Sequence, residues 1–344
     1  MEKIDQVIGR MNALVDIQRE LESVLQTLVL NDSTIIDALA QLLGAVQQMT
    51  SQSEEIQKKL AEEVRQMRLE VTALGAASHR AANLVASEAG EFERDNPEIG
   101  VLAYLAPAIA DPIAIDVGAN AGEVSARLLK AGYSVYAFEP YQPAFDKLAK
   151  RLGTDPNFHA FPFAIGPSDA TRNLHIAKAV AGAEKYDTSL FHSLVEHSLG
   201  ADLTFDSVAP VTVRSIDSLR RSGEIPARSG ILKIDTEGFD LEVIRGIGDA
   251  NYPVVMTEYW DPAHVFGVSG HGSLPEIVAE MSRRGYGWYV VIYHLDEAGK
   301  ISYYCNRDET ISKSWGNAIF FRDHSLFARA VGWLEGVLRP TLFG

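Results

Sequence analysis

The residues best suited to chemistry form a polar loop, Asp116 to Gly122, that directly follows an apolar run. Gly118 and Gly122 permit the close backbone approach and tight turning that a Cβ would block. Asp116 can meet an ammonium group, directly or through water, and Asn120 can meet a carboxylate or brace the loop. The loop leads into a predicted helix, whose N-terminus favours negative groups. These features predict a site for a nucleotide-like ligand.

A second carboxylate indicates which kind of ligand this is. Glu139 ends the next predicted strand, 21 positions beyond Gly118, where an acidic residue accepts hydrogen bonds from ribose hydroxyls. Pro140 stiffens the turn that follows, and Ala164 and Ile165 could flank an adenine ring. The glycine spacing is Gly-x-x-x-Gly, whereas dinucleotide dehydrogenases carry Gly-x-Gly-x-x-Gly. The wider gap favours a nucleoside with an amino-acid tail, as in S-adenosylmethionine.

A third polar group follows the short apolar run 231–234. Asp235 lies at the strand end, where ligands of open α/β sheets bind, and is expected to contact the cofactor or organise the loop. Glu237 is the first candidate for contact with the molecule that would accept the methyl group. It could instead be a carboxylate that faces a helix N-terminus. Lys233 lies within the strand and needs a partner, for which Glu258 on the neighbouring strand is a candidate.

Methyl transfer to an acceptor that is still protonated calls for a general base within hydrogen-bond reach. The candidates are Asp235, Glu237, Glu258 and a histidine of the region 166–229, either His175 or His192. Asp235, Glu237 and Glu258 could also converge as oxygen ligands of a divalent metal. Nothing in their spacing requires a metal, so none is assigned.

Short apolar runs alternate with helical segments from residue 99 onward, which is typical of a parallel α/β sheet. The region 166–229 is too long for a simple crossover and is expected to form part of the substrate pocket or a lid. Strands are predicted at 112–117, 134–138, 158–165, 231–234 and 254–258, antiparallel closing strands at 287–293, 300–305 and 316–321, and helices at 122–131, 143–152, 241–245, 273–284 and 325–338.

Five segments together resemble the FkbM-type methyltransferases, and they cover most of the span from 112 to 260. The block around Lys-Ile-Asp-x-Glu-Gly is the most specific, whereas Thr188 to Leu190 only approximates the Ser-Ser-Leu segment of typical members. The matching segments are Ile113–Ser125 (IAIDVGANAGEVS), Val135–Phe145 (VYAFEPYQPAF), Val213–Leu219 (VRSIDSL), Ile231–Gly246 (ILKIDTEGFDLEVIRG) and Val254–Trp260 (VVMTEYW).

The resemblance implies a Rossmann-like class I methyltransferase sheet with helices on both faces. It implies O-methylation of a hydroxyl on a sugar, a glycan or a glycosylated small molecule, as in polysaccharide biosynthesis, with S-adenosylmethionine as methyl donor. It assigns cofactor contacts to Asp116, Gly118, Asn120, Gly122 and Glu139, to which we add Ser125 at the end of the first segment, and reaction-side roles to Lys233, Asp235 and Glu237. The alternatives are a non-catalytic coiled-coil scaffold with a relic Rossmann domain and, less favoured, an NAD-dependent oxidoreductase.

Residues 1–75 carry apolar residues in a heptad rhythm that predicts a coiled coil. We expect this arm to form a homo-oligomer or to dock the enzyme, and residues 76–98 to connect it to a catalytic domain at 99–344. Cap and turn residues at Asn31 to Thr34 leave two forms open, a continuous rod and a helical hairpin. Packing of the arm on its own catalytic domain is a further alternative.

Charge and composition indicate which partners and which cellular location the protein is expected to have. The net charge of −15 argues against nucleic acid, because phosphate binding needs a basic face. One cysteine, Cys305, and a charged N-terminus without an apolar h-region favour a cytoplasmic protein. The predicted closing helix at 325–338 is expected to cover the sheet, with contact to a membrane surface as the less favoured alternative.

Overall fold

The computed structural model describes residues 96–182, 187–267, 272–296 and 299–341, together with residues 41, 44 and 48. Contacts divide the chain into Met1–Leu74 and Gly75–Gly344, and every element below belongs to the second unit. Apart from residues 41, 44 and 48, the coiled-coil arm predicted at 1–75 lies outside the described residues, as does all of the predicted connection before residue 96.

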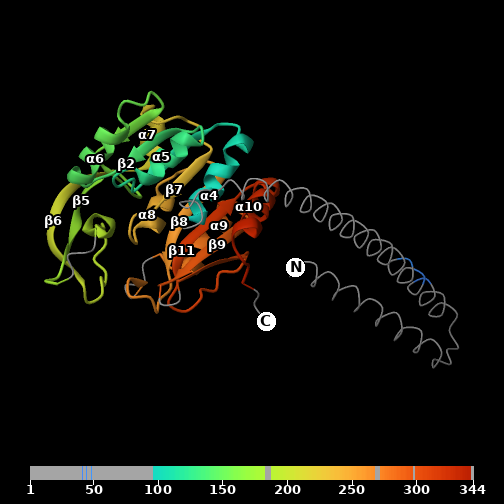
Figure 1. The fold of residues 1–344 in the computed structure, drawn as a ribbon. Helices are drawn as coiled ribbons and strands as arrows, with labels where there is room; N and C mark the ends of the chain where they lie inside the picture. The colour runs from blue at the N-terminus through green and yellow to red at the C-terminus, as the bar shows by residue number, and fades with distance from the viewer. Residues whose placement is uncertain are drawn as a thin grey trace. The chain divides into compact units, whose positions relative to one another are not determined.

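A mixed sheet of eight strands forms the centre of the second unit, in the order β10-β9-β11-β8-β7-β1-β2-β3 (Figure 1). Five strands are parallel and three close the sheet in antiparallel fashion, as the sequence predicts. The parallel strands are β1 (Ile113–Val117), β2 (Ser134–Phe138), β3 (Phe158–Phe161), β7 (Ile231–Ile234) and β8 (Val254–Trp260), and the others are β9 (Trp288–Leu295), β10 (Lys300–Cys305) and β11 (Trp315–Phe321).

The chain reverses its direction of travel across the sheet at β1. It passes outward through β2 and β3 and then returns to place β7 on the other side of β1. The loops after β1 and β7 therefore run to opposite faces, and such a switch point opens the crevice in which α/β sheets bind ligands.

Helices cover both faces of the sheet, as the resemblance implies (Figure 1). Because side chains alternate along a strand, neighbours such as Ala114 and Ile115 belong to different cores. One core includes α4 (Pro97–Leu105), α5 (Glu123–Lys130), α6 (Gln142–Leu152) and α10 (His324–Val337), and the other includes α7 (Ile216–Ser222), α8 (Asp240–Arg245) and α9 (Leu274–Arg283).

Helix α10 covers the sheet, the arrangement favoured from its sequence. Its residues Ala330, Trp333 and Leu334 are buried against α4 and the sheet. Gly100 of α4 lies against the Trp333 ring, where a Cβ would come within 2.3 Å of the indole. Among the described helices, none combines the length and the hydropathy needed to cross a bilayer.

Two sequence predictions fail in this unit. The strand predicted at 158–165 is two strands, because Pro162 cannot donate to a ladder and the chain leaves the sheet after Phe161. Helix α4 begins at Pro97, within the region assigned to a connection and the start of the domain. Its apolar residues are buried around most of its circumference, so it lacks the one-sided pattern that reveals a surface helix.

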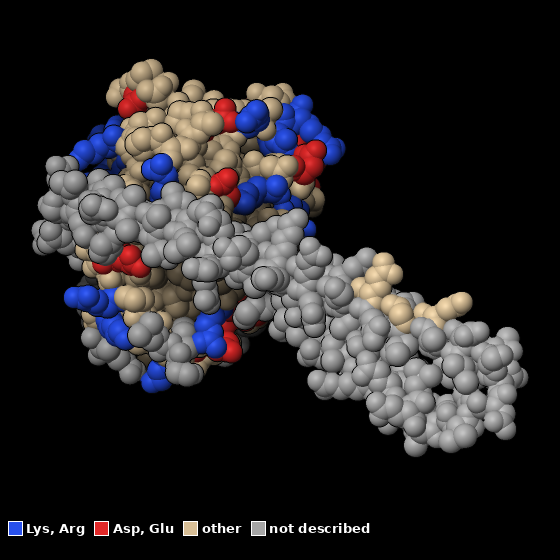
Figure 2. Space-filling model, turned by 90° about the vertical axis from the view of Figure 1, so that its right-hand side faces the viewer, with Lys and Arg blue, Asp and Glu red and all other residues tan. Residues whose placement is uncertain are grey.

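The region 166–229 builds most of a second, three-stranded sheet in the order β4-β6-β5, followed by α7. Strand β4 (Ala164–Ile165) pairs with β6 (Leu203–Arg214), which also pairs along its length with β5 (Ala170–Ala179). The short 3-10 helix η2 (Thr188–Phe191) lies between β5 and β6 along the chain. On the face shown in Figure 2, acidic and basic side chains are interspersed over the described surface.

Candidate functional site

Asp116 and Ser125 lie beneath the loop that follows β1, outside the pockets that surround it. Both are fully buried, and the Ser125 hydroxyl donates to Asp116 Oδ2 at 2.6 Å. This bond ties the first turn of α5 to the end of β1. Their position assigns Asp116 and Ser125 to bracing the loop.

The two glycines of the loop are required by packing. Gly118 has a φ of 74°, and a Cβ there would lie 1.8 Å from the carbonyl oxygen of Asp235. Gly122 has a φ of 85° and is pressed against Leu148 of α6. Only Gly118 lines a pocket. Close packing against helix α6 therefore accounts for Gly122.

Glu139 links two loops and faces the pocket between them. Its Oε1 accepts the Tyr141 N–H at 2.8 Å, and its Oε2 accepts the Asn120 N–H at 2.9 Å. Burial raises its pKa, although these two N–H groups oppose the shift. Asn120 adopts a left-handed conformation and accepts the Ser189 hydroxyl at 3.3 Å, which connects the loop to η2.

The first pocket is narrow, about 100 Å³, and brings together seven of the ten predicted cofactor residues. The region 166–229 contributes part of its wall, and so does Phe138, which the sequence analysis did not single out. The predicted residues that line it are Gly118, Asn120, Glu139, Pro140, Ala164, Ile165 and Asp235.

His192 and His175, the two candidate histidines of the region 166–229, are poorly suited to act as the general base. His192 lines the first pocket, but its Nδ1 accepts the Ala177 N–H at 3.1 Å, so the neutral ring carries its proton on Nε2. Burial lowers the pKa of His192 to about 4, and a ring in this state donates a hydrogen bond. His175 lies on β5 beside Phe205 and lines none of the described pockets.

Lys233 does not pair with Glu258, as the sequence suggested, but with Asp116 and Asp235. Its Nζ lies 3.1 Å from Asp116 Oδ1 and 3.4 Å from Asp235 Oδ2, and it donates to the Gly118 carbonyl at 3.0 Å. The register explains this choice, because Lys233 lies opposite Asp116 on β1. Burial alone would lower the pKa of Lys233, but the two carboxylates outweigh it and raise the pKa.

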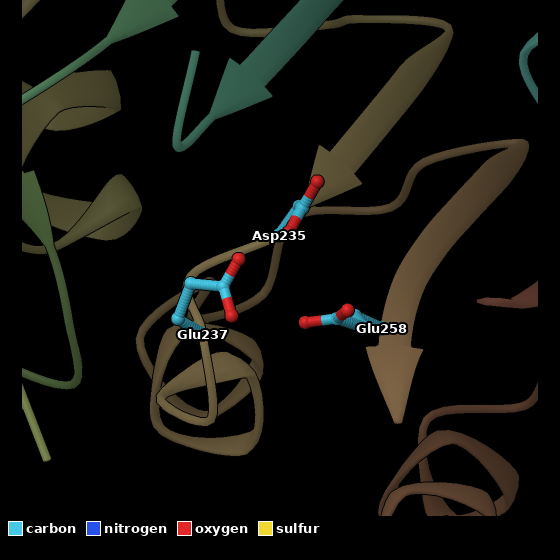
Figure 3. Close-up of side chains that lie close together, drawn as sticks. All are labelled: Asp235, Glu237 and Glu258. Carbon is cyan, nitrogen blue, oxygen red and sulfur yellow. The ribbon is translucent and has the colours of Figure 1, made fainter. Parts of the chain in front are cut away.

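Asp235, Glu237 and Glu258 point toward one another (Figure 3). They come from the end of β7, the turn after it, and β8. One carboxylate oxygen from each lies within 4.8 Å of the others, a spacing that suits a shared proton or one divalent cation. Burial, followed by the neighbouring carboxylates, raises the pKa values of Glu237 and Glu258 well above the usual range.

Asp240, which the sequence analysis did not single out, holds the backbone around these carboxylates. One oxygen accepts from the Thr236 N–H and hydroxyl, and the other accepts from the Thr257 hydroxyl and the Glu258 N–H. The side chain is buried at the start of α8. Its only sequence signal is its place in the Thr-Glu-Gly-Phe-Asp segment, four positions after Thr236.

A second and larger cavity, about 660 Å³, lies on the other side of the carboxylates. Asp235, Glu237 and Leu190 line both pockets, whereas Glu258 lines only the second of these two. Most of its wall comes from residues outside the segments that resemble the family, including Glu98, His264, Trp315 and Asn317. Such residues carry no local motif, because they come from three distant parts of the chain.

Comparisons with known proteins place this arrangement among methyltransferases. Residues 116–287 match the model of the family described as Methyltransferase FkbM domain. The hexuronic acid methyltransferase AglP of Haloferax volcanii is 25% identical over 180 residues, which are 50% of this chain and 67% of that protein. The methyltransferase sdnD of Sordaria araneosa is 25% identical over 201 residues, 52% of this chain and 74% of that protein.

Among solved structures, a SAM-dependent methyltransferase from Agrobacterium tumefaciens aligns with a TM-score of 0.36 and 11% identity. The alignment covers 68% of this chain and 64% of that one.

Removal of the Lys233 charge should destabilise the protein strongly. Lys233→Met leaves the Asp116 carboxylate buried without its cation, and such a loss costs about 3–5 kcal/mol. Lys178→Met, which breaks the exposed pair with Asp206, should cost at most about 1 kcal/mol. Urea denaturation followed by tryptophan fluorescence measures both. Equal and small losses would show that the buried pair does not hold β1 to β7.

Proposed function

The chain belongs to the FkbM methyltransferase family, and from this premise we propose that it transfers the methyl group of S-adenosylmethionine to a hydroxyl of a sugar, a glycan or a glycosylated small molecule. The observation that carries the proposal is the wall shared by the two pockets. Asp235 and Glu237 line both of them. A proton acceptor therefore lies at the boundary between a pocket suited to a methyl donor and a cavity large enough for an acceptor.

The residues of the first pocket fit an adenosine-type donor, which supplies a methyl group on a sulfonium centre. Each oxygen of Glu139 accepts one backbone N–H and keeps a further lone pair for a ribose hydroxyl. Ala164 and Ile165 present apolar surface for an adenine ring. His192 can add a hydrogen-bond donor through Nε2. These features support S-adenosylmethionine more than a pyrophosphate-containing dinucleotide.

Glu237 is the side chain best placed to take the proton of an acceptor hydroxyl. Asp235 is engaged by Lys233, whereas the Glu237 carboxylate has no hydrogen-bond or ion-pair partner among the described residues. Its backbone has a φ of 56°, and its carbonyl accepts the Ser193 hydroxyl at 2.6 Å. A non-glycine residue held in this conformation is restrained by its surroundings, which fixes the carboxylate at the boundary. Its raised pKa brings the base closer to neutral pH.

Glu139→Ala should weaken the binding of S-adenosylhomocysteine by about ten- to hundredfold, because hydrogen bonds to a charged acceptor are lost. Isothermal titration calorimetry measures the affinity. Glu123→Ala is a matched control, since Glu123 is exposed and pairs only with Arg151 on the surface. If the wild-type protein fails to bind S-adenosylhomocysteine at millimolar concentration, the proposed function is refuted.

Glu237→Gln should leave S-adenosylhomocysteine affinity within about twofold and reduce turnover by about 10²–10⁴-fold, the usual contribution of a general base. A base must be ionised to accept a proton, so wild-type activity should rise with pH through the raised pKa of Glu237. Glu258→Gln removes a neighbouring negative charge and should shift this rise to lower pH. Equal losses of affinity and turnover in Glu237→Gln would contradict a role on the acceptor side.

We also propose that the heptads of residues 1–75 join several copies of the chain. The support is the apolar seam in the sequence, which must be buried against another helix. Deletion of residues up to about Gly90 should yield a smaller assembly by multi-angle light scattering. An unchanged molar mass per particle, after correction for the deleted residues, would show that the seam packs within one chain.

A further inference from the structure

We propose that the larger cavity selects a saccharide that carries an amino group and excludes acid sugars. This inference rests on the proposed function, because it assigns the cavity to the methyl acceptor. It concerns the charge and hydrogen-bonding character of the acceptor, which follow from the cavity wall.

The cavity wall is acidic. Six carboxylate side chains line it, and its described residues include neither lysine nor arginine. His264 is the one lining side chain that could become cationic, and burial lowers its pKa. The six carboxylates are those of Glu98, Asp202, Asp235, Glu237, Glu258 and Asp296.

Three buried acceptor atoms in this wall lack hydrogen-bond donors, and Glu258 Oε2 is one of them. Glu98 and Asn317 are only 7% and 8% exposed, and Glu98 Oε2 and Asn317 Oδ1 have no hydrogen-bond partner. His294 Nε2 lies 3.7 Å from Glu98 Oε2, beyond hydrogen-bond length. Buried polar atoms are normally paired, and those that are not call for an explanation. A ligand rich in O–H and N–H donors would supply the missing partners.

The same wall presents aromatic surface. Trp260 and Trp315 both line the cavity. Trp315 is held in place by its indole N–H, which donates to Asp296 at 2.8 Å, and by stacking on His294. Aromatic faces suit both the apolar face of a sugar ring and a nearby ammonium group. The combination of acceptors, carboxylates and indoles therefore matches an amino sugar.

An acid sugar meets the opposite conditions. Its carboxylate would approach a wall of six acidic side chains that contains no lining lysine or arginine, and like charges repel strongly in a partly buried site. The relative from Haloferax volcanii is named for a hexuronic acid. We infer that this chain differs from that relative in the charge of its acceptor.

The test compares matched methyl glycosides of a 2-amino-2-deoxyhexose, the neutral hexose and the hexuronic acid, in the gluco, galacto and manno series. Calorimetry is performed on the full chain saturated with S-adenosylhomocysteine, in EDTA and again in magnesium. At least one amino glycoside should bind at least about tenfold more tightly than its uronate, as expected when a charged hydrogen bond replaces a repulsion.

Two variants connect the preference to the cavity. Glu98→Gln should reduce the preference for the amino over the neutral glycoside by about tenfold. Asn317→Ser should weaken both by the same factor. Asp146→Asn removes an exposed carboxylate from α6 and should change neither. If Glu98→Gln does not fold, Glu258→Gln provides the same comparison.

Uronate binding as tight as amino glycoside binding in EDTA would overturn the inference. Uronate binding that appears only with magnesium would overturn it as well, because the carboxylates would then serve a divalent cation. Failure of every amino glycoside to bind would also refute it. In each case, intact binding of S-adenosylhomocysteine leaves the proposed methyltransferase function standing, so the two failures can be told apart.

Discussion

The buried ion pair between Lys233 and Asp116 is the interaction on which the rest of the site depends. It joins the adjacent strands β7 and β1 where the order of the sheet reverses. The ammonium also meets the carbonyl of Gly118 and the carboxylate of Asp235, and Asp116 in turn holds Ser125 of α5. Desolvation of such a pair is costly unless hydrogen bonds satisfy the remaining groups. These bonds fix the loops after β1 and β7, and with them both walls of the first pocket.

Much of the fold could be predicted because buried parallel strands are short apolar runs with turn residues at their ends. Strands such as β2 and β7 begin and end where the sequence indicates. Residues around the first pocket could be predicted for the same reason, because Gly118, Asn120 and Gly122 follow the end of β1 and Glu139 follows the end of β2. What the sequence could not reveal is which side chains meet across strands. The partner of Lys233 depends on the register with β1, which no local pattern encodes.

The residues that line the larger cavity were even harder to predict from the sequence. Glu98 and Asn317 belong to α4 and β11, at opposite ends of the second unit's sequence, and neither carries a motif. The sequence did indicate that the region 166–229 would contribute to a pocket, because it interrupts the order of core elements. It did not indicate that Leu190, from η2, would border both pockets. The residues in loops at strand ends therefore allow the type of reaction to be predicted from the sequence. The residues that would contact the acceptor can be identified only in the folded structure.

Asp240 gives the carboxylate wall a further property. By bonding Thr236, Thr257 and the Glu258 backbone at once, it ties the loop after β7 to strand β8 and so limits how far Asp235 and Glu237 can move away from Glu258. Lys233 offsets part of the repulsion among these carboxylates at Asp235, and a proton or a positively charged ligand would relieve more of it. Ligands that bind the folded state alone stabilise it by mass action. A ligand that offsets this negative charge would therefore also raise the stability of the folded chain.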